Sequence, residues 1–233
     1  MFVKICGITS EDDALLATAL GADALGFVFA PSRRQVNAET VRDILKRLPR
    51  EVITIGVFRN ERRERVVDLA ARVGLHGVQL HGEEPLSEVR WIRERVQFVV
   101  QAFNAGDPAL ATAANSPADI ILVDSPSPGS GKVFDWRLAE GVPGGVRLLL
   151  AGGLTADNVG DAIKLVRPWG VDVSSGVEVS PGRKDARKLH RFIESARDAG
   201  EAVADRAIDL TAVDDASNGV PGVDRPWDWQ LDQ

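Results

Sequence analysis

The chain has 233 residues, of which 44% are hydrophobic and 27% charged, as expected for a globular protein with a sizeable core. Its net charge of −6 lies in residues 201–233, which contain eight acidic residues and two arginines, so residues 1–200 are neutral overall. Neither segment has the basic excess of a nucleic-acid-binding protein. No apolar stretch approaches the roughly 18 residues that span a bilayer, no signal-peptide pattern opens the sequence, and the single cysteine, Cys6, allows no internal disulfide, so we expect a cytoplasmic protein without a membrane segment.

Eight short apolar runs recur along the chain. They are nearly continuous in Val, Ile, Leu and Phe, which is typical of parallel strands covered by helices. The predicted strands, in chain order, are Val3–Ile8, Ala24–Phe29, Val52–Phe58, Gly77–Leu80, Phe98–Ala102, Ile120–Val123, Arg147–Ala151 and Val171–Ser174.

Segments with helical periodicity separate these runs. The predicted helices are Glu11–Leu20, Ala38–Leu48, Arg62–Val73, Pro85–Arg95, Asp107–Asn115, Trp136–Glu140, Asp157–Val166 and Lys184–Ala199, with the weakest patterns at 107–115 and 136–140.

This alternation predicts a single-domain α/β fold, a (β/α)8 TIM barrel formed by residues 1–200. A doubly wound open sheet is the competing fold, but it usually has fewer strands, and the first turn here, Cys6–Thr9, is not a glycine-rich phosphate loop. We expect residues 201–233 to form a flexible acidic extension. Within it, Trp227 and Trp229 are candidates for docking on the barrel or on a second subunit.

In a TIM barrel the functional side chains lie at the carboxyl ends of the strands. Cys6 ends the first strand, where a thiol suits proton chemistry, although a buried cysteine often serves only as a small hydrophobic residue. Asp124 follows the apolar strand Ile120–Val123, and its partial desolvation would raise its pKa and suit a general acid, unless it only caps the next loop. His81 is either a core histidine or a site residue, and Asp172 lies on the last strand.

Two turns rich in glycine and serine follow the seventh and eighth strands. Backbone N–H groups in such turns can approach an anion, and the loops after these two strands often bind phosphate in TIM barrels. The candidate phosphate-binding residues are Gly152, Gly153, Ser174, Ser175 and Gly176. The segment Gly129–Lys132 is a further candidate for an anion contact or a lid, but it does not fit a Walker loop.

Five segments together resemble the phosphoribosylanthranilate isomerase family of tryptophan biosynthesis, in order over about residues 2–198. They are Lys4–Thr9, Gly77–Gly82, Phe134–Trp136, Ala151–Leu154 and Val171–Glu178. The resemblance implies a (β/α)8 barrel without cofactor or metal. It also implies an Amadori rearrangement of N-(5-phosphoribosyl)anthranilate, so the expected binding partner is this small phosphorylated substrate. Whether the protein is a monomer or a homodimer stays open.

The resemblance also implies roles for individual residues. Cys6 is similar to the family's general base and Asp124 to its general acid, while Arg34 matches the arginine that holds the anthranilate carboxylate. Asp172 matches an aspartate of the last strand that lies near the substrate, and His81 stays a candidate substrate-binding residue. The segment 30–34 lacks the family's common Ser-Pro-Arg order, so the choice of Arg34 over Arg33 stays open at this point.

A thiolate base requires a lowered pKa or a neighbouring cation. Lys4, two residues before Cys6 on the same strand face, is the candidate cation.

Two other functions compete with this one. The histidine-pathway aminoaldose–ketose isomerase performs the same class of reaction, but we expect an aspartate there at the position of Cys6. A non-catalytic protein that binds phosphorylated ligands on a barrel scaffold is the second alternative.

Overall fold

The computed structural model describes residues 1–125, 135–139 and 145–214. The predicted anion-binding or lid segment 129–132, Phe134 of the family motif, and the tryptophans of the segment 226–229 lie outside these residues.

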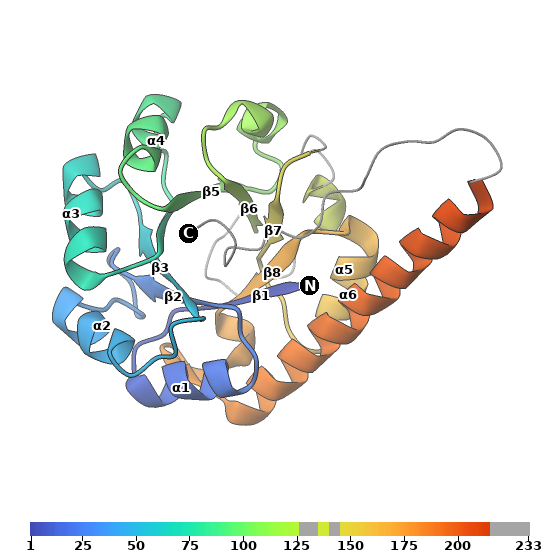
Figure 1. Cartoon of the computed structure of the whole chain (residues 1–233), viewed down its shortest axis with the longest axis horizontal. Coiled ribbons are helices and arrows are strands. Elements are labelled where there is room, and N and C mark those ends of the chain that lie inside the picture. The colour runs from blue at the N-terminus through green and yellow to red at the C-terminus, as the bar shows by residue number, and fades with distance from the viewer. Residues whose placement is uncertain (126–134, 140–144, 215–233) are drawn as a thin grey trace.

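Eight parallel strands close into a barrel in sequential order, which confirms the predicted (β/α)8 fold (Figure 1). The strands are β1 (Phe2–Cys6), β2 (Ala24–Val28), β3 (Ile53–Phe58), β4 (Gly77–Leu80), β5 (Phe98–Asn104), β6 (Ile120–Asp124), β7 (Leu148–Leu150) and β8 (Gly170–Val173). The ring closes where β1 pairs in parallel with β8.

The first strand ends two residues earlier than predicted. Gly7 adopts a φ of 74°, which β-strand backbone does not use. The N–H groups of Gly7 and Ile8 then both donate to the carbonyl of Gly26, at 2.9 and 3.0 Å. This turn leaves Cys6 as the last residue of β1, at the carboxyl end of the barrel.

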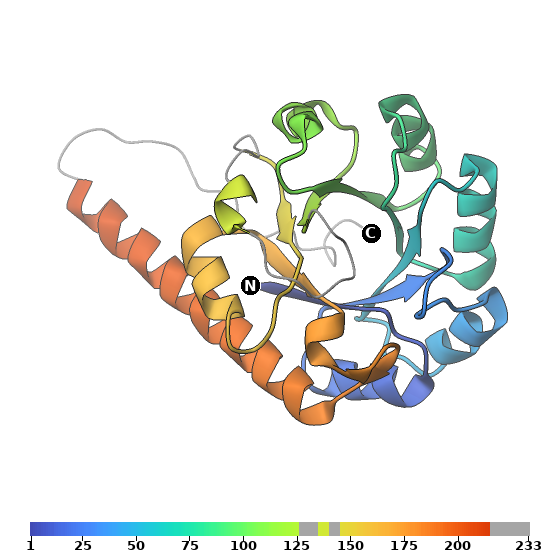
Figure 2. The same ribbon diagram turned by 180° about the vertical axis from the view of Figure 1, so that it is seen from behind.

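A ring of helices covers the outside of the barrel (Figures 1 and 2). The α-helices are α1 (Glu11–Ala19), α2 (Ala38–Leu45), α3 (Arg63–Val73), α4 (Leu86–Arg93), α5 (Val159–Val166) and α6 (Ala186–Asp214). At the two positions with the weakest helical pattern the structure has 3-10 helices instead, η1 (Pro108–Asn115) and η2 (Trp136–Ala139).

The hydrophobic core has two parts. One lies inside the barrel and includes Ala24, Ile55, Val100 and Leu122. The other lies between strands and helices and is larger; there side chains such as Ile5 contact the inner faces of the helices. Because strand side chains alternate, the neighbours of Ile5 on β1 point into the barrel.

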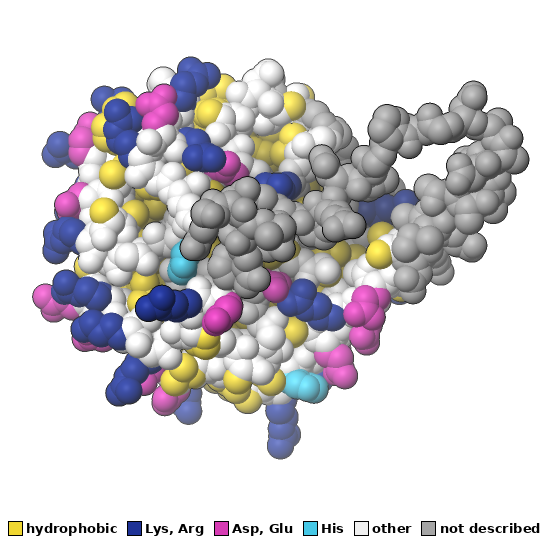
Figure 3. All heavy atoms as spheres, viewed as in Figure 1, with side chains coloured by type: hydrophobic (Ala, Val, Ile, Leu, Met, Phe, Trp, Pro, Cys, Tyr) yellow, Lys and Arg dark blue, Asp and Glu magenta, His cyan; other side chains and the backbone are white. Residues whose placement is uncertain are grey.

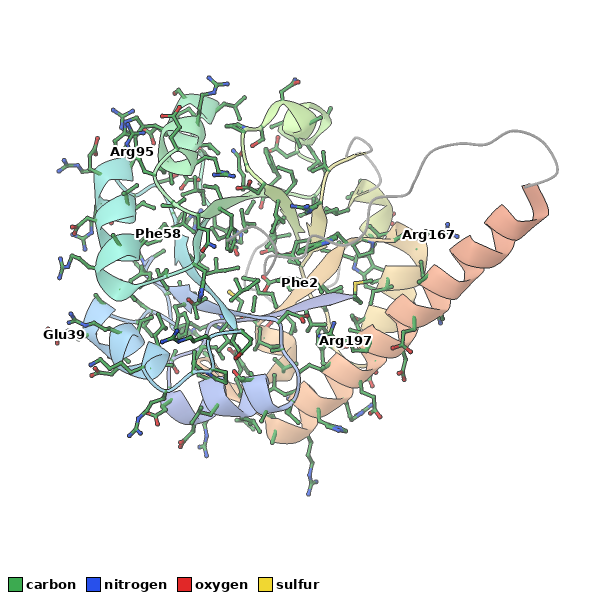
Figure 4. The ribbon with its side chains drawn as sticks, in the orientation of Figure 1. Phe2, Glu39, Phe58, Arg95, Arg167 and Arg197 are labelled. Atoms are coloured by element: carbon green, nitrogen blue, oxygen red, sulfur yellow. The ribbon has the colours of Figure 1, made fainter. Side chains whose placement is uncertain are left out.

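Helix α6 extends further than the predicted Lys184–Ala199 and runs past residue 200, projecting beyond the barrel in Figure 1. Its residue Arg197, labelled in Figure 4, ties the helix to the amino end of the barrel. It donates to the carbonyls of Met1 and Gly21 and, at 2.8 Å, to Asp23 Oδ2. The division into residues 1–200 and an acidic extension of 201–233 stays a prediction. Among the described helices, none combines the length and apolarity needed to cross a membrane.

A short antiparallel hairpin between β8 and α6 was not predicted. It consists of β9 (Glu178–Ser180) and β10 (Arg183–Lys184), joined through Gly182 with a φ of 83°. Its strands are short and polar, so no apolar run marks them in the sequence. The hairpin brings two charged side chains, Glu178 and Lys184, under the carboxyl end of the barrel.

Candidate active site

A cavity of about 690 Å³ opens at the carboxyl end of the barrel. Of the predicted site residues it is lined by Cys6, Arg34, His81, Asp124, Asp172 and Ser174. Basic, acidic and histidine side chains gather near the centre of the barrel face seen in Figure 3. The lone thiol and the carboxyl group of β6 therefore share one cavity.

Cys6 sits in a tightly packed place at the end of β1. Its residue is only 8% exposed, and it pairs in register with Gly26 on β2. A Cβ atom at Gly26 would lie 2.8 Å from Cys6 Sγ and 3.2 Å from Lys4 Nζ. Because real Cβ atoms essentially never come within 3.0 Å of another atom, any larger residue at position 26 would force the thiol or the strand to shift.

Lys4 lies one layer deeper in the barrel, on the same face of β1 as Cys6. Its side chain is fully buried and forms an ion pair with Asp172, with 2.9 Å between Nζ and Oδ1. The pairing register of β1 with β8 places the two residues directly opposite each other. The positive charge of this ammonium group lowers the pKa of the Cys6 thiol, which makes Lys4 the cation that the sequence suggested.

The net pKa of Cys6 is nevertheless raised. Burial is the largest cause and raises it; Lys4 and Lys184 lower it, and the negative charge of Asp172 raises it again. Burial also disfavours the charged form of Lys4, but Asp172 and Cys6 outweigh that effect and raise the pKa of this ammonium group. In the free site the sulfur is therefore a thiol at neutral pH, next to a charged lysine.

Asp124 ends β6 and is 8% exposed. Its Oδ1 accepts a hydrogen bond from the N–H of Ser125 at 2.7 Å, and its Oδ2 lies 3.3 Å from Nε2 of His81. The other ring nitrogen of His81 lies 2.8 Å from the amide nitrogen of Gln79. His81 is thus held between a neutral amide and the candidate acid, which favours a site role over a core role.

Arg34 lines the cavity, whereas its neighbour Arg33 is exposed and does not line it. Two hydrogen bonds of 2.8 Å join Nε and Nη2 of Arg34 to the two carboxylate oxygens of Glu178. The aliphatic part of Arg34 passes over Gly7, where a Cβ atom would lie 2.5 Å from Arg34 Cδ. The geometry therefore favours Arg34 over Arg33 as the cation of the site.

The turns after β7 and β8 have the backbone freedom that an anion site uses. Gly152 and Gly153 both have positive φ values, of 87° and 66°. A Cβ atom at Gly176 would lie 1.9 Å from the carbonyl oxygen of Leu154, so the two loops touch there. Of this group only Ser174 lines the cavity. Its hydroxyl is buried and has no hydrogen-bond partner among the described residues.

Sequence reasoning missed Glu178 and Lys184 as site residues. Lys184 is buried in the hairpin and donates from Nζ to the carbonyl of Cys6 at 2.6 Å and to Glu178 Oε1 at 3.0 Å. Glu178 had appeared only as the end of a family motif, and Lys184 only as the first residue of a helix. The Pro181-Gly182 pair, which is typical of a turn, was the available sign of a hairpin.

Within residues 1–125, 135–139 and 145–214, no three or more His, Cys, Asp or Glu side chains are grouped as a metal ion would need.

The family model described as N-(5'phosphoribosyl)anthranilate (PRA) isomerase matches residues 3–195. The N-(5'-phosphoribosyl)anthranilate isomerase of Desulforudis audaxviator is 48% identical over 204 residues, which cover 84% of this chain and 98% of that protein. The crystal structure of phosphoribosyl anthranilate isomerase from Thermus thermophilus is 41% identical, with a TM-score of 0.81 over 85% of this chain and 99% of the other.

A second solved structure was determined in complex with reduced 1-(o-carboxyphenylamino)-1-deoxyribulose 5-phosphate. That phosphoribosyl anthranilate isomerase is 43% identical to this chain, with a TM-score of 0.75 over 84% of this chain and 98% of its own. The likeness thus covers nearly the full length of these relatives.

Proposed function

The chain belongs to the family of N-(5'-phosphoribosyl)anthranilate isomerases, and we propose that it performs the family's reaction with Cys6 as general base and Asp124 as general acid. It is an isomerase of tryptophan biosynthesis that converts phosphoribosylanthranilate to 1-(2-carboxyphenylamino)-1-deoxyribulose 5-phosphate. The reaction is an Amadori rearrangement, in which two hydrogens change position and no atom is gained or lost.

Ring opening is the first step and needs an acid. Asp124, in its protonated form, gives its proton to the ribose ring oxygen as the bond from this oxygen to C1′ breaks. The nitrogen lone pair forms the Schiff base, and Asp124 is left as a carboxylate. The 3.3 Å contact between Nε2 of His81 and Oδ2 of Asp124 supports this role, because His81 can orient the carboxyl group.

Proton abstraction follows and needs a base. The Schiff base acidifies the hydrogen at C2′, and the Cys6 thiolate removes it while the electron pair moves toward the nitrogen. The resulting enolamine becomes the ketone as C1′ takes up a proton and the C2′ hydroxyl gives one up. Cys6, which has gained a proton, and Asp124, which has lost one, return to their starting forms by proton exchange with solvent. The ammonium group of Lys4 supports this step because its positive charge favours the thiolate form of Cys6. Since the pKa of Cys6 is raised, we expect turnover to increase with pH as the thiol ionises.

The two anionic ends of the substrate need separate partners. We assign the anthranilate carboxylate to Arg34, which can offer a bidentate edge. We assign the phosphate to the turns at Gly152, Gly153 and 174–176, supported by the buried hydroxyl of Ser174, which has no hydrogen-bond partner in the described part of the chain. His81 and Asp172 line the same cavity as Arg34 and Ser174 and are proposed substrate contacts.

The observation that carries the assignment is that the only cysteine of the chain and a buried strand-end carboxyl group line one cavity. The fluorescence of phosphoribosylanthranilate falls on conversion, so a fluorescence assay tests the activity directly. We expect turnover of this substrate by the wild-type protein and none of the aminoaldose substrate of the histidine pathway. Binding of both without turnover would instead indicate a non-catalytic phosphate-ligand protein.

We also place the enzyme in the cytoplasm. A free thiol that must ionise for each turnover is best kept reduced there, because thiol pools oppose its oxidation.

A further inference from the structure

Glu178 holds one edge of the Arg34 guanidinium group. Both carboxylate oxygens accept from Arg34 at 2.8 Å, from Nε and from Nη2. This edge is one of the two that an arginine can use for bidentate binding of a carboxylate, the other being Nη1 with Nη2. Among the described residues, Nη1 and the second hydrogen of Nη2 have no hydrogen-bond partner, and Arg34 lines the cavity.

Glu178 is itself fixed from behind by Lys184. The Nζ atom of this buried lysine donates to Glu178 Oε1 at 3.0 Å, to the carbonyl of Cys6 at 2.6 Å and to the carbonyl of Ser174 at 3.3 Å. One ammonium group therefore joins the end of β1, the end of β8 and Glu178. Arg34 is in this way linked through two side chains to the proposed base and to the proposed phosphate site.

The charges in this chain of contacts alternate in sign from Arg34 through Glu178 to Lys184. Burial acts against the charged form of Glu178, but the hydrogen bond with Arg34 and the charge of Lys184 outweigh it and lower the pKa of Glu178. The side chain of Glu178 is only 4% exposed. A buried carboxylate of this kind holds its partners in one geometry, because breaking either contact leaves a charge unpaired.

We propose that Glu178 is a positioning residue for substrate recognition: it orients Arg34 so that the free side of the guanidinium group binds the anthranilate carboxylate at a fixed distance from Cys6. This proposal rests on the proposed function of Arg34 and of Cys6. It assigns a role in substrate specificity to the hairpin of β9 and β10, which carries both Glu178 and Lys184. A purely structural role for Glu178 is the competing explanation.

The two explanations differ in their dependence on the substrate's carboxylate. We would measure kcat and KM of wild type and Glu178→Gln with phosphoribosylanthranilate and with phosphoribosylaniline, which lacks the carboxylate. Glutamine keeps the size of the side chain but cannot accept two hydrogen bonds from Arg34. We expect kcat/KM for phosphoribosylanthranilate to fall about 10- to 100-fold, mainly through KM, as for the loss of one charge-assisted hydrogen bond. For phosphoribosylaniline we expect values close to those of the wild type.

A double-mutant cycle with Arg34→Met sharpens the test. If Glu178 acts through Arg34, then Glu178→Gln causes no further loss of kcat/KM in the Arg34→Met background. Asp23→Asn is the matched control, because Asp23 pairs with Arg197 at the opposite end of the barrel. Asp23→Asn should lower the thermal unfolding midpoint but should change kcat/KM by the same factor for both substrates.

Glu178→Asp is the second variant in case Glu178→Gln does not fold. It keeps the negative charge for Lys184 but is one methylene too short to hold both partners, so the same selective loss is expected. Equal losses with both substrates, or additive losses in the cycle, would overturn the proposal. If the wild type turned over neither substrate, the proposed function would be refuted instead.

Discussion

The ammonium group of Lys4 lies 2.9 Å from Oδ1 of Asp172, on the barrel-facing side of β1 that also carries Cys6. Both side chains are nearly inaccessible to solvent, at 0% and 9% exposure. An isolated charge at such a depth would be strongly unfavourable, so each group depends on the other. The Cys6 thiolate is a second anion for the same ammonium group, and Asp172 and the sulfur therefore compete for Lys4.

This competition predicts opposite shifts in two variants. Lys4→Met removes the cation and should raise the pKa of Cys6, whereas Asp172→Asn removes the competing anion and should lower it. The other charged groups acting on the sulfur, Lys184 and Arg34, stay in place in both variants. The pH dependence of iodoacetamide alkylation measures this pKa directly, because the chain has one cysteine. Shifts in the same direction would mean that the substitutions only disturb packing.

The raised pKa of Cys6 also predicts a loss of stability at alkaline pH. The folded chain holds the thiol proton more tightly than the unfolded chain, whose thiol ionises near the ordinary value of 9.0. The resulting stabilisation is complete below that pH and is lost as pH rises toward the folded-state pKa. Urea unfolding midpoints of wild type should therefore fall more steeply above pH 9.0 than those of Cys6→Ala. Parallel curves would show that the thiol pKa is not raised.

Removal of either proposed proton-transfer group should stop most turnover without preventing binding. We expect Cys6→Ala and Asp124→Asn each to lower kcat about 10²- to 10⁴-fold, the usual contribution of a general acid or base. The affinity for reduced 1-(o-carboxyphenylamino)-1-deoxyribulose 5-phosphate, measured by calorimetry, should stay close to that of the wild type. A kcat near the wild-type value in both variants would refute the two roles.

The glycine beside the thiol gives a steric prediction. In Gly26→Ala the new methyl group would lie 2.8 Å from Cys6 Sγ, so the sulfur or the strand must move and activity should fall sharply. Gly160→Ala, in helix α5, is the matched control. Its new Cβ atom would lie 3.8 Å from the Cβ of Ala199 in helix α6, which is an ordinary contact distance. For Gly160→Ala we expect full activity and a free energy of unfolding higher than that of the wild type by up to about 1 kcal/mol. Equal activity of both variants would contradict the packing at Cys6.

The barrel could be predicted from the sequence because each strand is a nearly continuous apolar run. Cys6 and Asp124 could also be placed, since each ends such a run and the carboxyl ends of parallel strands meet at one edge. The positions at which strands end were predicted less accurately. The first strand stops at Cys6 because the turn at Gly7 is held by a hydrogen bond to Gly26, which is distant in sequence.

Contacts between side chains of elements that are distant in sequence could not be predicted from the sequence. The pairing of Arg34 with Glu178 joins residues 144 positions apart, and only the hairpin of β9 and β10 brings them together. The same contact distinguishes Arg34 from Arg33, which the local sequence alone left open. The ion pair of Lys4 with Asp172 depends on the register between the first and last strands, which closure of the barrel determines.

The central claim is that Cys6 and Asp124 act on one substrate from two sides of the same cavity. A crystal structure of this chain with reduced 1-(o-carboxyphenylamino)-1-deoxyribulose 5-phosphate tests it most directly. We predict Cys6 Sγ within about 3.5 Å of the ligand's C2′ atom, and an Asp124 oxygen within about 3 Å of the oxygen that leaves the ribose ring. A ligand bound with either group turned away from these atoms would contradict the account.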